Sequence, residues 1–393
     1  MKKLLTLSIS LATLCPTLVL ADMQEFMTAL GAGKSNMDMR LRTEWVDDNL
    51  KKEASATTIR TTLAYKTADY QGFSGFIQFE DVTNFGHEHY NNNTALASAK
   101  TAYAVIADPT LTQVNQVFVE AYGVKLGRQK IVLDNARFVG DVGWRQNDQT
   151  FDAISYNNKV LLPGTTLNLA YVNKVHNIVG KIVPVSAPML NVRYSKVFGD
   201  FGINASAFYY GVEYDVAKND SFQDIGFKVD GSIKDFLYEA SFAQQSDYAD
   251  GKTPDADYMD LQLGYNFGAV TLKVQQEVLE KGFKTPLATL HAFNGWADRF
   301  LNTPAKGLVD SNVKLTAKYA GFNFVLAGHS FATDTDDIAL GTELDFSVAK
   351  NINKNLSVLV KGALYEADSD AGKAAAGLKN DVKKGWIQAM YKF

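Results

Sequence analysis

Apolar and polar residues alternate with a period of two along most of this chain, and this pattern constrains the fold more than any other feature. In the segment 37–45 one phase is apolar and the other is charged: Met37, Met39, Leu41 and Trp45 against Asp38, Arg40, Arg42 and Glu44. The segments 190–195, 225–230, 313–319 and 343–348 repeat this alternation. Successive side chains of a strand point to opposite faces, so each segment predicts a β-strand with one apolar face and one wet face.

The last segment of the chain, 381–393, shows the same alternation and ends on an aromatic residue. Ile387, Ala389, Tyr391 and Phe393 share one face, which resembles the closing strand of a bacterial outer-membrane β-barrel. Beyond the first 21 residues, no apolar run approaches the ~20 residues that a helical membrane span needs. A membrane location therefore predicts a closed barrel, because only closure satisfies every backbone polar group in lipid. We expect the strand ending at Phe393 to be the segment read by the barrel-assembly machinery, and lipid and lipopolysaccharide to surround the barrel.

The first residues of the chain are typical of a secretory signal peptide. Lys2 and Lys3 precede an apolar run over 4–20, and Ala21 is a small residue at the expected cleavage site. We therefore predict a signal peptide at 1–21 and a single barrel domain at 22–393. Cleavage would remove Cys15, the single cysteine, and would change the formal net charge from −4 to about −6 by loss of two lysines. This charge is too mild to indicate a nucleic-acid partner, and no basic patch with interleaved aromatic residues occurs.

The spacing of the breaks between alternating segments predicts the number of strands. Eight short turns alternate with nine longer connections, which gives about eighteen antiparallel strands with both termini on the short-turn side. The longest connections are near 84–113, 132–150 and 281–309. If the break at Gly123 is misread, sixteen strands is the alternative. The predicted fold class is all-β, a transmembrane up-and-down barrel, and roughly 16–18 strands leave an aqueous channel.

Arginine is distributed unevenly, and this asymmetry is the main indication of selectivity. Seven of the eight arginines lie between positions 40 and 193, whereas lysine occurs throughout. A guanidinium keeps its charge and binds carboxylates in a planar, bidentate way, so a row of arginines in a lumen favours anionic solutes. The candidate pore-lining residues are Arg40, Arg42, Arg60, Arg137, Arg145, Arg193, Asp38, Glu44 and Glu120. The alternative is that the arginines pair with Asp38, Glu44, Glu80 and Glu120 and stiffen the wall; both roles can coexist.

Arg128 does not fit this scheme, because it shares strand phase with apolar Val124 and Leu126. Either Gly127 forms a bulge that reverses the phase, or the strand sits at the rim.

Two blocks of sequence resemble the alginate-export type of outer-membrane porin. They read GRQKI at 127–131, LDNARFVG at 133–140, WRQN at 144–147, QTFDA at 149–153, and TPLATLHAFNGWAD at 285–298. The resemblance implies an eighteen-stranded barrel, lined by arginine, lysine and acidic groups, that conducts anionic sugar polymers or smaller acids. This chain is short for a polymer exporter, which favours smaller acids.

The connection 281–309 carries a second group of candidates. Trp296 and its aromatic neighbours would be costly to leave in water, so this loop is expected to fold onto the barrel mouth or into it. Asn294 can cap a short helix over 295–301. A loop inside the barrel would form a constriction or lid that carries His291, Trp296, Asp298 and Arg299; the alternative is an ordered surface loop.

These features together predict a passive outer-membrane channel that favours sugar acids, uronates or other carboxylates, in a Gram-negative bacterium and with both termini in the periplasm. The alternative is a non-selective, structural or adhesive barrel. No enzyme is expected, because no Gly-x-Ser-x-Gly motif or nucleophile–His pair is found, and no cofactor or metal is implied.

Overall fold

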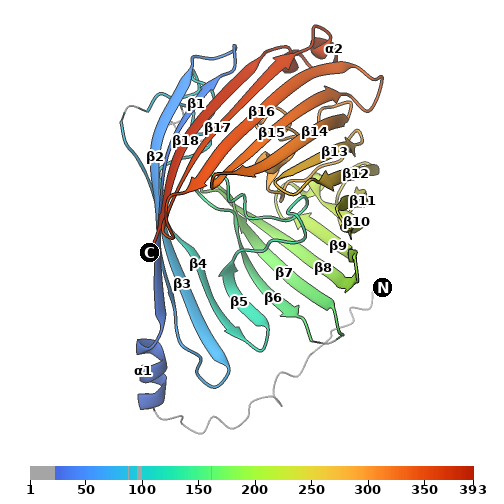
Figure 1. The fold of residues 1–393 in the computed structure, drawn as a ribbon. Coiled ribbons are helices and arrows are strands. Elements are labelled where there is room, and N and C mark those ends of the chain that lie inside the picture. Colours follow the sequence, from blue (N-terminus) through green and yellow to red (C-terminus); the bar gives the residue numbers. More distant parts are fainter. Residues whose placement is uncertain (1–22, 87, 95–99, 161) are drawn as a thin grey trace.

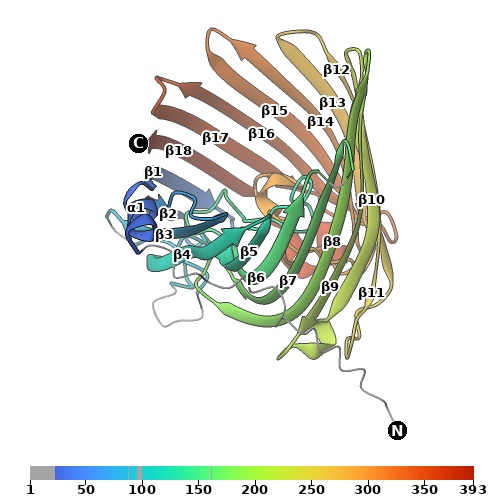
Figure 2. The same ribbon diagram turned by 90° about the horizontal axis from the view of Figure 1, so that it is seen from below.

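The strands form one closed antiparallel barrel around a central lumen (Figures 1 and 2). The computed structural model of the protein describes residues 23–86, 88–94, 100–160 and 162–393, so the predicted signal peptide lies outside the described residues. Eighteen strands pair in sequence order, and β1 pairs with both β2 and β18. The predicted fold class and the count of eighteen strands are confirmed, including the hairpin turn at Gly123.

The strands have the following bounds. They are β1 Lys34–Asp47, β2 Ala54–Lys66, β3 Phe73–Asn84, β4 Leu111–Ala121, β5 Val124–Gln129, β6 Thr150–Asn158, β7 Thr165–His176, β8 Ile182–Phe198, β9 Phe201–Tyr214, β10 Phe222–Ile233, β11 Phe236–Asp247, β12 Ala256–Asn266, β13 Val270–Leu279, β14 Leu308–Tyr319, β15 Phe322–Ala332, β16 Ala339–Asn351, β17 Leu356–Ala367 and β18 Val382–Lys392. The described residues also form five short helical segments: α1 Met23–Gly31, η2 Lys218–Asp220, η3 Leu290–Ala292, α2 Ala371–Ala374 and η4 Ala376–Leu378.

The first and last strands close the barrel in continuous register. Met39 lies opposite Tyr391, and Asp47 lies opposite Lys383, without a bulge between them. Closure leaves no strand edge unpaired, which is the condition for burying a sheet in a membrane. The terminal strand therefore completes the hydrogen-bonded ring.

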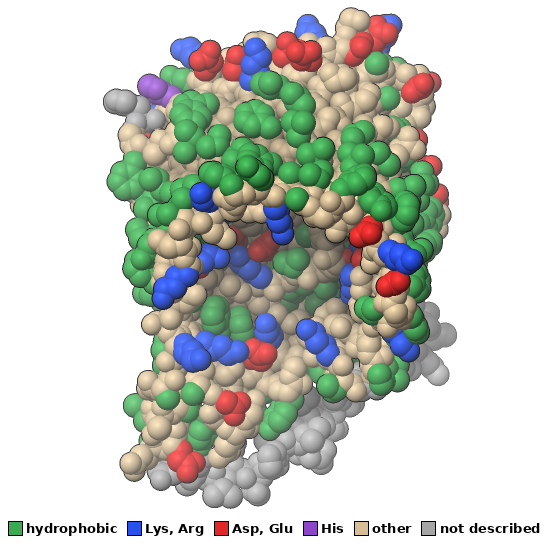
Figure 3. Space-filling model, in the orientation of Figure 1, with side chains coloured by type: hydrophobic (Ala, Val, Ile, Leu, Met, Phe, Trp, Pro, Cys, Tyr) green, Lys and Arg blue, Asp and Glu red, His purple; other side chains and the backbone are tan. Residues whose placement is uncertain are grey.

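Side chains of the two strand phases face different surroundings, as the alternation predicts. Outward Leu41, Leu63 and Leu126 are 45%, 52% and 63% exposed, whereas inward Arg42 and Glu44 are each 1% exposed. Figure 3 shows the outward residues as a broad hydrophobic band above a hollow lined by Lys, Arg, Asp and Glu side chains. Such an apolar outer band with a polar interior is typical of barrels that sit in lipid.

The helix α1 is a feature that the sequence pattern did not predict. Its nine residues precede β1 and stand at the turn end of the barrel, beside β2 and β3 (Figures 1 and 2). Among the described residues, no helix has the length and apolar character needed to cross a membrane.

Candidate functional site

Three long connections place buried polar side chains against the inward face of the barrel wall. They are the segments 85–110, of which 85–86, 88–94 and 100–110 are described, 130–149 and 280–307, and their buried polar residues include Asp108, Arg137, Arg145, Gln146, Asp148, His291 and Asn294. The first segment packs Tyr90 and Ile106 against inward Val46 and Ala54. The loops thus narrow the lumen. The 281–309 connection is expected to fold onto the barrel mouth or into the barrel, and it lies inside the barrel.

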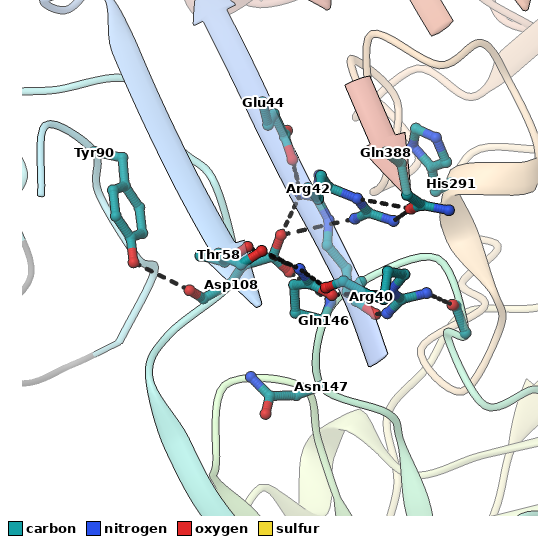
Figure 4. Close-up of polar contacts among 12 residues, drawn as sticks. Arg40, Arg42, Glu44, Thr58, Tyr90, Asp108, Gln146, Asn147, His291 and Gln388 are labelled. Atoms are coloured by element: carbon teal, nitrogen blue, oxygen red, sulfur yellow. Dashed lines mark hydrogen bonds and ion pairs between the residues drawn. The ribbon is translucent and has the colours of Figure 1, made fainter. Parts of the chain in front are cut away.

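The segment 130–149 is fixed to the first two strands through Arg40. Its Nε donates to Gln146 Oε1 at 2.8 Å, and its NH1 donates to the Gly143 carbonyl at 2.9 Å (Figure 4). Gln146 in turn donates to Thr58 Oγ1 of β2 at 2.8 Å. Arg40 is only 6% exposed, so it acts as an anchor for the loop backbone.

Arg42 lies two residues further along β1, on the same face, and contacts both β18 and the segment 85–110. Its NH2 donates to Gln388 Oε1 of β18 at 2.7 Å, and its NH1 lies 3.8 Å from Asp108 Oδ2 (Figure 4). The guanidinium also stacks 4.1 Å from the ring centroid of Trp144. A planar cation suits this position because it can bind a carboxylate at its edge and an aromatic ring at its face.

Arg145 joins two of the three inward loops, 130–149 and 280–307, to the wall. Its NH1 lies 2.9 Å from Glu44 Oε2 on β1, and its NH2 lies 2.8 Å from Asp298 Oδ2 in the segment 280–307. All three side chains are at most 7% exposed. Burial by itself would lower the pKa of Arg145, but Glu44, Asp108 and Asp298 raise it above its usual value, so the guanidinium stays charged.

Arg137 occupies a second anchor on the opposite side of the lumen. Its Nε lies 2.6 Å from Glu277 Oε1 of β13, and its NH2 donates to Asn294 Oδ1 at 3.1 Å. The predicted helix over 295–301 with Asn294 as its cap is wrong. Asn294 has a positive φ of 54° and its side chain binds Arg137 and Glu277, so it is unavailable for capping.

His291 lies at the centre of a lysine–aromatic cluster that holds the segment 280–307 in place. Lys361 of β17 places its Nζ 2.7 Å from His291 Nε2 and 3.6 Å from the ring centroid of Trp296. The His291 ring also stacks on Trp144 at 4.6 Å. Since a lysine ammonium can only donate, Nε2 accepts and the Nδ1 hydrogen is donated to Asp298 Oδ1 at 2.6 Å.

The pKa values of His291 and Asp298 are both lowered, which leaves the histidine neutral and the aspartate charged. Burial lowers the pKa of His291 well below its usual range, against the opposing pull of Asp298. Burial alone would raise the pKa of Asp298, but His291 and Lys384 hold it well below its usual range. Asp298 is therefore charged and His291 neutral near neutral pH.

The remaining candidate residues are placed in less buried positions. Arg60 lies 2.8 Å from Glu80, and the half-buried Arg193 lies 3.2 Å from Asp134 and 3.4 Å from Asp230. These contacts and those of Arg145 show that wall pairing, the alternative interpretation, applies to Glu44 and Glu80.

The other acidic candidates have no arginine partner within the described ranges. Glu120 lies 3.4 Å from Lys66, and Asp38 is in the inward phase of β1 with a buried Oδ1 that accepts no hydrogen bond there. Arg299 donates to the Gly377 carbonyl near the mouth. Whether the candidate arginines line the conducting path stays a prediction.

Arg128 follows the phase of its exposed neighbour Leu126, because the register of β5 with β4 and β6 is continuous. Gly127 therefore does not reverse the phase, and β5 ends at Gln129, one residue after Arg128. Arg128 binds Asp152 at 2.9 Å and the carbonyl of Val114 at 2.9 Å, so it is outside the lumen group.

Several buried or partly buried residues of the site were not among the predicted candidates. They are Asp108, Trp144, Gln146, Asp148, Glu277, Glu343, Asp345, Lys361, Lys384 and Trp386. A signal existed for Trp386, which is a large apolar residue in the polar phase of the last strand and is 1% exposed. Such a residue in an inward position indicates that something other than water covers it.

The barrel resembles several crystal structures over nearly its whole length. Acinetobacter baumannii OccAB1 has a TM-score of 0.69 at 12% identity, over 93% of this chain and 97% of that chain. Pseudomonas aeruginosa OccK9 (OpdG) has a TM-score of 0.69 at 12% identity, over 93% and 99% of the two chains. Pseudomonas aeruginosa OpdK with vanillate has a TM-score of 0.67 at 11% identity, over 92% and 98%.

At these identities the likeness establishes the fold, which is the closed eighteen-stranded antiparallel barrel. No protein-family model matches the chain, and no curated protein matches it. Membership of the alginate-export type of porin therefore stays a prediction.

Proposed function

We propose that this protein is an outer-membrane channel through which small anionic solutes diffuse passively. The observation that carries the proposal is the closed barrel with a hollow, charged lumen that is narrowed by three anchored loops (Figures 2 and 3). Buried anchors at Arg40, Arg137 and Arg145 keep the loops from collapsing into the remaining space. A fixed constriction lets a channel discriminate among solutes without a moving part.

The preference for anions is supported by a pair of lysines whose mutual repulsion lowers the stability of the folded barrel. Lys273 and Lys314 lie directly opposite each other on β13 and β14, in the inward phase. Like charges at opposite cross-strand positions are destabilising. No ion pair of either lysine occurs in the part of the chain that the structure describes. Their placement is reasonable in a lumen where a passing carboxylate supplies the missing negative charge.

The solute class is inferred from the same groups. Arg193 keeps 29% of its side chain exposed and Lys130 keeps 27%, and each is also ion-paired with two carboxylates. These cations suit carboxylates such as sugar acids or uronates, which fits an alginate-export type of channel for small acids. One of the structures that share the fold was solved with vanillate, an aromatic carboxylate.

We further propose an orientation with the short turns and both strand termini in the periplasm, and with lipid and lipopolysaccharide around the apolar band. The strand β18, which ends beside Phe393 and pairs with both β17 and β1, is the segment we expect the barrel-assembly machinery to read.

Planar-bilayer recording tests the channel. Purified protein in a KCl gradient should give stable conductance with a reversal potential shifted toward the chloride equilibrium potential. Sugar acids added to the bath should reduce the current, and in cells the channel should support their uptake. Absence of conductance would favour a structural barrel, and potassium preference would contradict the role given to the lysines and arginines.

A further inference from the structure

The helix α1 is attached to the turn end of the barrel by contacts from its second half. The Ala68 backbone N donates to the Ala29 carbonyl at 3.1 Å, and the Tyr65 hydroxyl donates to the Leu30 carbonyl. Both figures of the fold place α1 beside β2, outside the lumen (Figures 1 and 2). The helix is therefore fixed to the outer side of the rim.

The free surface of α1 is sharply divided between apolar and polar residues. At 3.6 residues per turn, its four large apolar side chains fall within an arc of about 100°. They are Met23, Phe26, Met27 and Leu30, with exposed fractions of 70%, 41%, 57% and 36%. We call this set the α1 stripe. The opposite arc carries Gln24, Glu25 and Thr28.

The α1 stripe continues an apolar surface that belongs to the barrel wall. Tyr65, which binds the end of α1, has the same outward phase as Leu63, which is 52% exposed. Phe26 packs edge-on against Tyr70 in the adjoining turn, with 5.6 Å between ring centroids. The stripe therefore lies at the lower margin of the outward band, where exposed aromatic rings also collect.

Exposed rings mark the same level on the neighbouring hairpin. Phe73 and Tyr122 are 50% and 77% exposed, and their rings meet edge to face at 6.0 Å. Aromatic residues form girdles where a barrel passes from hydrocarbon to headgroups. An apolar helix face at the height of this aromatic girdle would lie next to the boundary between headgroups and acyl chains.

We propose that α1 is an interfacial helix whose stripe inserts into the membrane leaflet around the turn end of the barrel. The ligand is the boundary between headgroups and acyl chains of a lipid bilayer, and the inference rests on the membrane location proposed above. Amphipathic helices of this kind lie in the interface with the apolar face buried. The helix has no Lys or Arg and only Glu25 as a charged residue, so its binding depends on apolar area rather than on anionic lipid.

Site-directed spin labelling of the full chain tests this placement. Cys15 is the single cysteine and lies in the predicted signal peptide, so in the processed chain each introduced cysteine carries one nitroxide at a time. We would label Met27 and Met23 on the stripe and Thr28 on the polar arc, with Leu63 as the lipid control and Lys354 as the water control. The protein is reconstituted in phosphatidylcholine nanodiscs, and collision rates with oxygen and with a water-soluble nickel chelate are compared.

We expect the oxygen-to-nickel ratio at Met27 and Met23 to be several-fold higher than at Thr28 and close to that at Leu63. Addition of anionic lipid should leave it unchanged. If the ratio at both stripe positions equals that at Lys354 while Leu63 stays in lipid, α1 lies in water and the proposal is overturned. Shielding of the stripe from both reagents would show that protein covers it and would overturn the proposal equally. Water accessibility at Leu63 would instead refute the membrane location itself.

Discussion

Replacement of Arg145 by alanine should release the inward loops from the wall of the barrel. Glu44 makes its hydrogen bonds with Arg145 alone in the described contacts, and its side chain is 1% exposed. Asp298 keeps Lys384 at 2.7 Å and His291 at 2.6 Å, so Glu44 is the carboxylate left without a partner. Breaking a buried ion pair by removal of one member costs about 3–5 kcal/mol.

The lower end of that range is appropriate, because only one buried carboxylate is orphaned. About 3 kcal/mol corresponds to roughly a hundredfold shift in the equilibrium between the anchored and the released loop. We expect Arg145→Ala to lower the thermal melting midpoint of the detergent-solubilised barrel. Single-channel records should show larger conductance with added flickering, since exchange of a loop between anchored and locally unfolded states takes microseconds to seconds.

A double-mutant cycle with Glu44→Gln separates the orphaned charge from the lost packing. The variant that carries both substitutions should recover a large part of the stability lost by Arg145→Ala, because no unpaired carboxylate remains. The control is Lys66→Ala, which removes one member of an ion pair whose side chains are 51% and 32% exposed and should cost no more than about 1 kcal/mol. Unchanged melting and quiet currents in Arg145→Ala, or a double variant less stable than the single one, would refute the anchoring role.

Three further predictions concern selectivity, pH and assembly. Lys273→Gln should reduce the chloride-to-potassium permeability ratio while stabilising the barrel by about 0.2–1 kcal/mol, because it removes the cross-strand repulsion with Lys314. The surface variant Lys306→Gln should change neither the permeability ratio nor the stability. An unaltered reversal potential for Lys273→Gln would refute the role of the lysine pair in anion preference. Because the pKa of His291 is well below its usual value, the unfolded chain binds a proton below about pH 6.5 that the folded loop does not, so stability falls as pH decreases from there. His291→Gln should flatten that part of the melting profile, and identical profiles for the variant and the parent would exclude His291 as the group concerned. Phe393→Ala should lower the fraction of heat-modifiable, assembled barrel on gels, whereas Tyr319→Ala, an equally outward aromatic at another turn end, should not; equal yields would remove the special role of the last strand.

The alternation of side chains was sufficient to predict the barrel. Residues such as Leu41 and Arg42 differ so strongly in their preferred surroundings that a shift of one position would place every side chain of the strand in the wrong medium. Turn chemistry then fixed the count, since the break at Gly123 separates two strands that a continuous run would merge. The short helix α1 escaped prediction because nine residues give too few turns for a periodic signal.

The candidate site was predictable only in part, and for a different reason. Sequence identified the arginines of the first strands and the aromatic loop around Trp296, because charge and apolar character are properties of single residues. It could not pair Arg145 with Asp298 or Lys361 with His291, which are 153 and 70 positions apart. Such pairs depend on where flexible connections come to rest inside the tube.

The sequence by itself therefore determined a two-faced sheet that must close, since local side-chain preference acts along each strand and needs no distant partner. The tertiary structure decided that three connections turn inward, and that four of the eight arginines, Arg40, Arg42, Arg137 and Arg145, are buried anchors. The physical reason is that burial and pairing of charge are set by long-range contacts, which form only after the ring of strands has closed.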